Sequence, residues 1–170
     1  LNIARVRKCL DTVQKCNVKF MVGFNRRFDP DFMALKSTID SGQIGDVEMI
    51  TITSRDPSAP SYEYITHSGG IFRDMTIHDF DMARWLLNEE VESIQATASV
   101  LTDPKIAELN DYDSVSIILG TKSGRQCVIS NSRRATYGYD QRIEVLGSNG
   151  MAQVKNKNNA NIEVACSKGF

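Results

Sequence analysis

Apolar residues follow a helical rhythm in three stretches of this 170-residue chain. In residues 2–16 they recur three or four positions apart, which predicts an amphipathic helix. A second helix is predicted between Asp29, a capping residue followed by Pro30, and Gly42, which favours termination. The third covers residues 74–87, DMTIHDFDMARWLL, where acids and a histidine interrupt the apolar spacing.

Other stretches have the composition of strands. The continuous apolar run of residues 18–24 predicts a buried strand of a parallel sheet. Residues 46–57 are rich in β-branched side chains and predict a strand with both faces partly covered. Residues 58–70, with Pro, Ser and Gly, predict a loop. Further strands joined by hairpin-type turns are predicted in residues 91–100, 113–134 and 139–156, with a last strand in residues 158–170.

This order of elements predicts two architectures along the chain. A helix followed by a buried strand is typical of an α/β domain, so residues 1–23 are interpreted as its last unit. The remainder, residues 24–170, predicts an α+β domain in which two helices pack on a largely antiparallel sheet.

Composition narrows the possible partners. Lys and Arg number 20 and Asp and Glu 21, so no overall field favours nucleic acid or an anionic membrane. The apolar runs are too short for a membrane span, and no secretion leader is recognised. The four cysteines lack metal-type spacing, which predicts reduced thiols in a cytoplasmic protein; they are Cys9, Cys16, Cys127 and Cys166. Partner selection is therefore expected to come from a local site.

The third predicted helix carries the candidate chemistry. Asp74, His78 and Asp81 fall on one face of a helical wheel, together with Trp85. Another face, which is predicted to pack against the protein, contains Ile77, Phe80, Arg84 and Leu87. A histidine between two carboxylates can be held in one tautomer and orientation, as a general base requires.

Three interpretations of this polar face remain open from the residues alone. Acids are favoured at the positive end of a helix, so the face could be a solvated helix start. Asp74, His78 and Asp81 could also chelate a divalent ion, although His67 is the only other histidine and no ligand spacing is specific. The third interpretation is an acid/base device. No metal site is predicted.

Several stretches together resemble the GFO/IDH/MocA oxidoreductases. They are NVKFMVGFNRRFDPDF, SRDPSAP, SGGIFRDMTIHDFDMARWLL and YGYDQRIEVLGSNGMAQV, and the likeness is strongest to the inositol 2-dehydrogenase branch. The resemblance covers nearly the whole chain, and the D-x-x-x-H run in the third predicted helix is its most specific part.

The resemblance implies a two-domain enzyme about twice this length. Residues 1–23 would be the last helix and strand of a Rossmann domain that binds NAD or NADP. Residues 24–170 would form the substrate-binding and oligomerisation domain, incomplete at its C-terminus, with a mostly antiparallel open sheet and helices on one face. The dinucleotide fingerprint and the E-K-P segment with the family's catalytic lysine are absent from this sequence and are expected upstream of Leu1. The chain alone is not expected to bind NAD or turn over.

The resemblance also implies roles for particular residues in oxidising a ring hydroxyl of a polyol or sugar. His78 would be the base and Asp74 would position it or relay its proton. Asp81 and Asp56 would accept hydrogen bonds from substrate hydroxyls. The remaining site residues would be Asn25 and Arg26 beside nicotinamide and substrate, and Tyr137 or Tyr139 closing the pocket.

Simpler interpretations stand beside these roles. Arg55 and Asp56 could form an ion pair at the strand end, and Arg26 or Arg27 could anchor the domain junction. The whole protein could act on another sugar or a ketone. It could also be a non-catalytic module that forms a homo-oligomer through its sheet.

Overall fold

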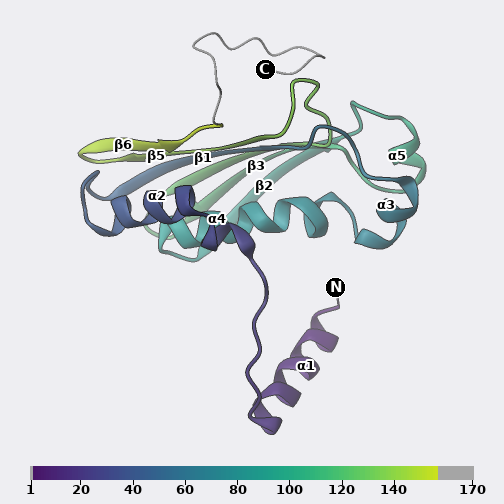
Figure 1. Ribbon diagram of the computed structural model, residues 1–170, viewed down its shortest axis with the longest axis horizontal. Coiled ribbons are helices and arrows are strands. Elements are labelled where there is room, and N and C mark those ends of the chain that lie inside the picture. The colour runs from purple at the N-terminus through teal and green to yellow at the C-terminus, as the bar shows by residue number, and fades with distance from the viewer. Residues whose placement is uncertain (1, 157–170) are drawn as a thin grey trace.

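The computed structural model describes residues 2–156, in which helices cover one face of a six-stranded sheet (Figure 1). The helices are α1 (Ile3–Cys16), α2 (Pro30–Asp40), α3 (Tyr62–Ser68), α4 (Ile77–Leu87) and α5 (Lys105–Glu108), with a 3-10 turn η1 (Asn25–Phe28) before α2 and a π-helical turn η2 (Phe72–Thr76) before α4. The strands are β1 (Val47–Arg55), β2 (Val91–Ser99), β3 (Ser114–Thr121), β4 (Gln126–Ser132), β5 (Asp140–Gly147) and β6 (Gly150–Val154).

The sheet is mostly antiparallel and open, which confirms the predicted α+β fold class. Its strand order is β2-β3-β4-β1-β5-β6. Strand β1 is parallel to β4 and antiparallel to β5, while all other described pairs are antiparallel. The early strand β1 therefore splits the later strands into two groups, instead of preceding one continuous meander.

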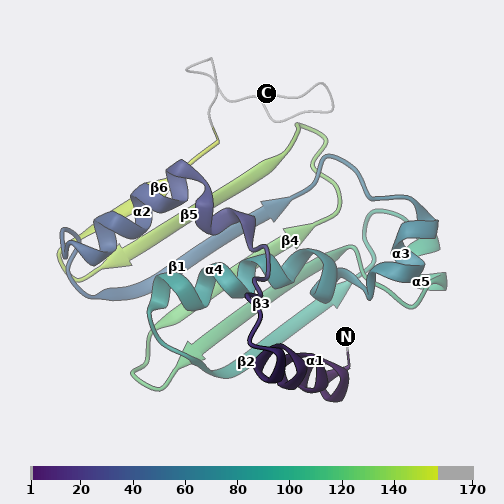
Figure 2. The ribbon, with the colours of Figure 1, turned by 60° about the horizontal axis from the view of Figure 1, so that its bottom comes forward.

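The core lies between the sheet and the two longer helices packed on it, α2 and α4 (Figure 2). Helix α2 begins at Asp29, whose carboxylate accepts hydrogen bonds from the N–H groups of Asp31 and Phe32, as the capping signal predicted. Phe32 and Leu35 of α2 are buried against the sheet. On β1, the residues facing the helices are buried, whereas Met49 on the opposite face is 45% exposed. Only one face of this strand is covered in the described chain, not both as predicted.

The predicted strand at residues 18–24 is absent from the structure. Helix α1 forms as predicted, capped by Asn2, but the following residues are extended and largely exposed, and they lead from α1 to the sheet (Figure 1). A strand requires a hydrogen-bonding neighbour, and none of the described strands lies beside this segment. The apolar residues of α1 are likewise exposed, including Ile3 at 72%. The predicted final strand, in residues 158–170, falls outside the described residues.

The predicted loop at residues 58–70 contains a helix, α3. The Ser61 hydroxyl accepts a hydrogen bond from the Tyr64 N–H, and Ile65 is buried, so a cap and one apolar anchor stabilise the helix despite the flanking turn residues. Gly69 and Gly70 follow with φ of 90° and 87°, a conformation that favours glycine and ends the helix.

The packing face predicted for the third helix is right for Leu87 and for the partly buried Phe80, and wrong for Arg84. Met82, Ala83 and Leu86 are fully buried, whereas Arg84 is exposed and pairs with Glu90. The buried stripe begins with Asp79, a charged residue that a hydrophobic pattern does not recognise as part of the core. The π-helical turn η2 also changes the angular relation between residues 72–76 and the helix that follows.

Asp113 organises the loop between β2 and β3. This buried carboxylate accepts hydrogen bonds from the N–H groups of Leu101, Thr102 and Asp103 and from the hydroxyls of Thr102 and Ser114. Burial disfavours the charged carboxylate and by itself would raise its pKa. The hydrogen-bond donors have the larger combined effect and lower the pKa of Asp113 to about 2.

The depressed pKa predicts a pH-dependent contribution to folding. Above the ordinary aspartate pKa the charged Asp113 contributes up to about 2 kcal/mol, and this is lost as the pH falls toward the folded-state value. Asp113→Asn should therefore lower the free energy of unfolding by about 2 kcal/mol at pH 7. Near pH 2 the variant and the unsubstituted protein should have nearly the same free energy of unfolding. Urea titrations across this range measure the difference. The exposed Asp46→Asn serves as control, and an Asp113→Asn deficit that does not shrink in acid would contradict the prediction.

Candidate active site

A buried carboxylate, Asp79 of α4, is the centre of a polar cluster beneath the sheet. It is paired with Arg26 of η1 and accepts hydrogen bonds from the Ser54 hydroxyl and the Asn131 amide, both at 2.7 Å. Thr76 extends the cluster by donating to the Asn131 carbonyl oxygen at 2.7 Å. Since Asp79 is fully buried, these partners are needed to offset the loss of its hydration. The cluster fixes η1 against the sheet and α4.

A second arginine of η1 holds a second carboxylate of α4. Arg27 donates two hydrogen bonds of 2.8 Å to Asp81, and its guanidinium lies 5.7 Å from the centre of the Trp85 ring. The hydrogen bond to Asp81 raises the pKa of Arg27. Arg26 and Arg27 thus both hold η1 against α4 within this domain. Asp81 is 7% exposed, and each of its oxygens accepts one hydrogen bond from Arg27.

The two predicted catalytic residues lie in different surroundings. Asp74, in η2, accepts a hydrogen bond from the Tyr64 hydroxyl at 2.6 Å and one from Arg133 at 3.3 Å. The hydrogen bond to Asp74 raises the pKa of Tyr64. His78 packs edge-on against Phe24, with ring centres 6.2 Å apart. Within residues 2–156 its Nδ1 is buried without a hydrogen-bond partner, and no hydrogen bond joins it to Asp74.

Asp56 belongs to the same polar region. Burial raises the pKa of its carboxyl, while Arg133 and Arg26 act in the opposite direction. The Arg55–Asp56 ion pair considered for this strand end does not form, since Arg55 instead donates to the Tyr137 hydroxyl at 2.8 Å. The half-buried Asp56 carboxyl is therefore not neutralised by its neighbour along the chain.

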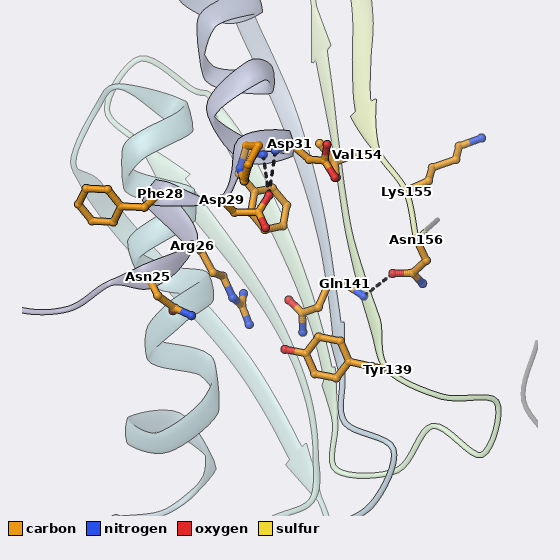
Figure 3. Close-up of a pocket in the computed structure, with 12 residues that line it drawn as sticks. Asn25, Arg26, Phe28, Asp29, Asp31, Tyr139, Gln141, Val154, Lys155 and Asn156 are labelled. Carbon is orange, nitrogen blue, oxygen red and sulfur yellow. Dashed lines mark hydrogen bonds between the residues drawn. The ribbon is translucent and has the colours of Figure 1, made fainter. Parts of the chain in front are cut away.

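An open groove of about 580 Å³ lies beside this cluster, between η1 and the end of β6 (Figure 3). Asn25 and Arg26 line one side, and Tyr139 and Gln141 lie opposite. The Gln141 Nε2 is buried and has no hydrogen-bond partner in the described chain. The groove thus presents amide, guanidinium and phenol groups, a lining suited to a polar ligand.

The two predicted pocket tyrosines separate because Gly138, with φ of 113°, interrupts the extended backbone between them. Tyr139 is 57% exposed and lines the groove. The Tyr137 hydroxyl accepts from Arg55 and donates to Asp140 at 2.8 Å, which is a structural role.

The sequence interpretation missed two central residues, Asp79 and Arg133. For Asp79 a signal was present, since it precedes Met82, Ala83 and Leu86 at the spacing of a buried helical stripe. For Arg133 no local signal exists, because its partners lie 59 and 22 positions away along the chain.

The cysteines carry free thiols where the structure describes them. They are Cys9, Cys16 and Cys127, and burial raises the pKa of Cys127 to about 12; Cys166 lies outside the described residues. In residues 2–156 no three His, Cys, Asp or Glu side chains are grouped so that they could hold a metal ion. The helices of the same range are all too short or too polar to cross a membrane.

The fold and the site together define a class of protein. It is an α+β domain with an open sheet, and a helix on the covered face of the sheet carries Asp and His. The sequence profile of the GFO/IDH/MocA C-terminal domain matches residues 32–153, and the chain belongs to this family. It is 63% identical to the inositol 2-dehydrogenase of Rhizobium meliloti (strain 1021) over all 170 residues, which span 52% of that protein.

Solved structures agree with this assignment. A crystal structure of a Sinorhizobium meliloti 1021 protein, 63% identical, superposes with a TM-score of 0.92, and the match covers 99% of this chain and 51% of that one. The scyllo-inositol dehydrogenase from Lactobacillus casei, solved with bound NAD(H) and scyllo-inositol, is 28% identical with a TM-score of 0.83 over 99% of this chain and 52% of that one. The chain thus spans about half the length of these relatives.

Proposed function

We propose that this chain is the substrate-binding part of an NAD(P)-dependent dehydrogenase that oxidises a ring hydroxyl of inositol or a related polyol. The observation that carries the proposal is the 63% identity, over the full chain, to an inositol 2-dehydrogenase. The site supports it, because it combines a histidine whose buried Nδ1 lacks a partner in the described chain with the half-buried Asp56 carboxyl, which can accept a hydroxyl hydrogen bond.

In this proposal the residues have distinct tasks. His78 takes the hydroxyl proton, and Asp74 supports it by orientation or by relaying the proton. Asp56 and Tyr139 bind substrate hydroxyls from the strand ends. Asp81, expected from the resemblance to contact substrate, is assigned instead to holding Arg27, since it is buried and both its oxygens accept from that guanidinium.

The cofactor is expected to reach this chain at the groove beside η1. When bound, the nicotinamide accepts the hydride that leaves the carbon as its hydroxyl is deprotonated. Asn25 and Arg26 line the groove with hydrogen-bond donors, which fits a polar cofactor edge. Arg26 is already held by Asp79 and Ser54, so Asn25 is the freer donor. The choice between NAD and NADP belongs to the part of the protein that binds the rest of the dinucleotide.

The proposed function is tested on the full-length protein with a panel of polyols. Myo-inositol, scyllo-inositol, glucose, xylose and sorbitol are each supplied with NAD or NADP, and reduced nicotinamide is followed by absorbance. We expect turnover of an inositol to exceed that of the open-chain control sorbitol by at least about 100-fold, because a site built for ring hydroxyls leaves polar groups unpaired with other substrates. Absence of turnover with every cyclitol and sugar would reject the proposal, as would equal rates across the panel.

We also propose that full-length copies associate through the uncovered sheet face. Helices cover the other face in both ribbon views (Figures 1 and 2). The strand register places five apolar side chains together on the uncovered face: Met49, Ile118, Val128, Leu146 and Met151. Four of these, all except Val128, are 42% to 49% exposed. An exposed apolar sheet of this kind is typical of an interface. The occupant we infer is a second copy of the same chain, in keeping with the oligomerisation expected from the sequence.

Ile118→Glu should lower the oligomeric mass of the full-length protein, because a carboxylate buried in an apolar interface is unpaired. Size-exclusion chromatography with light scattering measures the mass. Met33→Glu, at a position 52% exposed on the helical side, is the matched control and should not change it. An unchanged mass for Ile118→Glu, or a monomeric unsubstituted protein, would exclude this face as the interface.

A further inference from the structure

Arg133 is a buried charge that the proposed function does not use. It follows β4 directly and is 1% exposed, and its guanidinium bridges two carboxylates on different segments. One nitrogen donates to Asp74 and another to Asp111, each at 3.3 Å, while Nε has no partner in residues 2–156. A fully buried guanidinium is costly unless paired, and these two carboxylates, one of them the proposed partner of His78, supply its counter-charges.

The bridge belongs to a closed ring of contacts around the turn that carries Asp74. The second oxygen of Asp111 accepts a hydrogen bond of 2.9 Å from the Ile71 N–H, at the start of that turn. From Ile71 the backbone runs three residues to Asp74, whose carboxylate meets Arg133, and Arg133 returns to Asp111. Gly70 allows this approach, since a Cβ there would lie 3.0 Å from the Asp111 oxygen. The ring therefore couples the backbone of η2 to the position of the Asp74 carboxylate.

Charged groups from several elements surround Arg133. Asp74 is presented by η2 and Asp111 by the loop before β3. Asp56, after β1, is close enough for Arg133 to oppose the effect of burial on its pKa. The Tyr64 hydroxyl, from α3, holds the other oxygen of Asp74. Asp74 is thus fixed on both sides, by a phenol at Oδ1 and by the guanidinium at Oδ2.

We propose that Arg133 is a positioning residue for the dehydrogenase reaction, which sets the orientation of Asp74 through the bridge to Asp111. The inference rests on the proposed roles of Asp74 and His78. Arg133 itself is buried and is not expected to touch substrate or cofactor. Its contribution is to hold Asp74 in the geometry that the proton transfer requires, where an error of about 1 Å can cost about 100-fold in rate.

The test is a double-mutant cycle in the full-length enzyme with Arg133→Lys, Asp74→Asn and the double variant. Lysine retains the charge but cannot bridge two carboxylates with a planar fork. We expect Arg133→Lys to lower kcat by about tenfold to 100-fold, with KM for inositol and for NAD within about twofold. In the Asp74→Asn background the same substitution should lower kcat by less than about twofold, because Arg133 acts through Asp74. Arg84→Lys, at the exposed pair with Glu90, is the matched control and should leave kcat unchanged.

Other outcomes overturn the inference or the function separately. Equal losses from Arg133→Lys in both backgrounds, or a loss of thermal stability with kcat unchanged, would make Arg133 purely structural. If Asp74→Asn alone keeps full turnover, the role of Asp74 in the proposed function fails instead. Should Arg133→Lys not fold, Asp111→Asn replaces it in the cycle, since the asparagine side chain keeps an acceptor for the Ile71 N–H but loses both the charge and the oxygen that anchor Arg133. It should lower kcat in the same Asp74-dependent way, and additive losses would overturn the proposal.

Discussion

His78→Ala in the full-length protein is expected to lower kcat by about 100-fold to 10,000-fold with folding and NAD binding preserved. A positioned general base contributes a factor of this size, because the hydroxyl proton must leave as the hydride departs. The structure makes the loss specific to chemistry, since the described hydrogen bonds do not tie the His78 ring to the fold. Steady-state kinetics with an inositol and NAD measure kcat, and circular dichroism checks folding.

The second histidine provides the control for this experiment. His67 is exposed on α3, where its Nδ1 lies 2.9 Å from the Glu63 carbonyl oxygen. His67→Ala should change kcat by less than about twofold. Added imidazole should restore part of the activity of His78→Ala, because it can occupy the space of the lost ring and accept the proton. Undiminished NAD-linked turnover by His78→Ala would reject His78 as the base and favour the non-catalytic alternative.

Local signals were sufficient to predict much of the fold. The cap at Asp29 and the glycine at position 42 bracket α2, and the turn glycine in residues 121–125 lies between β3 and β4 as predicted. The run at residues 18–24 shows where such signals fail. Its composition favours a strand, but a strand forms only beside another, and that partner is not among the described strands. The insertion of β1 between β4 and β5 is also a long-range choice that periodicity does not determine.

The sequence indicated which residue types gather at the candidate site, but not how their side chains are arranged. The helical wheel drew attention to Asp74, His78 and Asp81, but it assumed a regular α-helix and equal surroundings. The π-helical turn breaks that regularity between Phe72 and Thr76, and each acid meets a different arginine. Those arginines come from segments 54 and 59 positions away, so their pairing depends on the folded sheet and could not be read from local sequence.

Asp79→Asn is expected to lower the free energy of unfolding by about 3 kcal/mol, the largest loss of stability among the substitutions considered. The carboxylate is fully buried and accepts from Arg26, Ser54 and Asn131. An asparagine amide of the same shape would place an N–H₂ group against one of these donors and leave Arg26 without its counter-charge. Breaking a buried pair on one side costs about 3–5 kcal/mol. Urea unfolding followed by fluorescence of Trp85, the chain's single tryptophan, measures the loss.

Two further variants separate this buried pair from an ordinary surface one. Asp40→Asn removes the charge from the pair with Lys36, where Asp40 is 57% exposed, and should cost about 0.5 kcal/mol or less. Arg26→Met added to Asp79→Asn should recover part of the loss, because the unpaired guanidinium is then removed and its apolar replacement can pack. If Asp79→Asn costs no more than Asp40→Asn, the cluster does not anchor η1. Because η1 also carries Asn25 beside the groove, Asp79→Asn should also lower the affinity of the groove for its ligand.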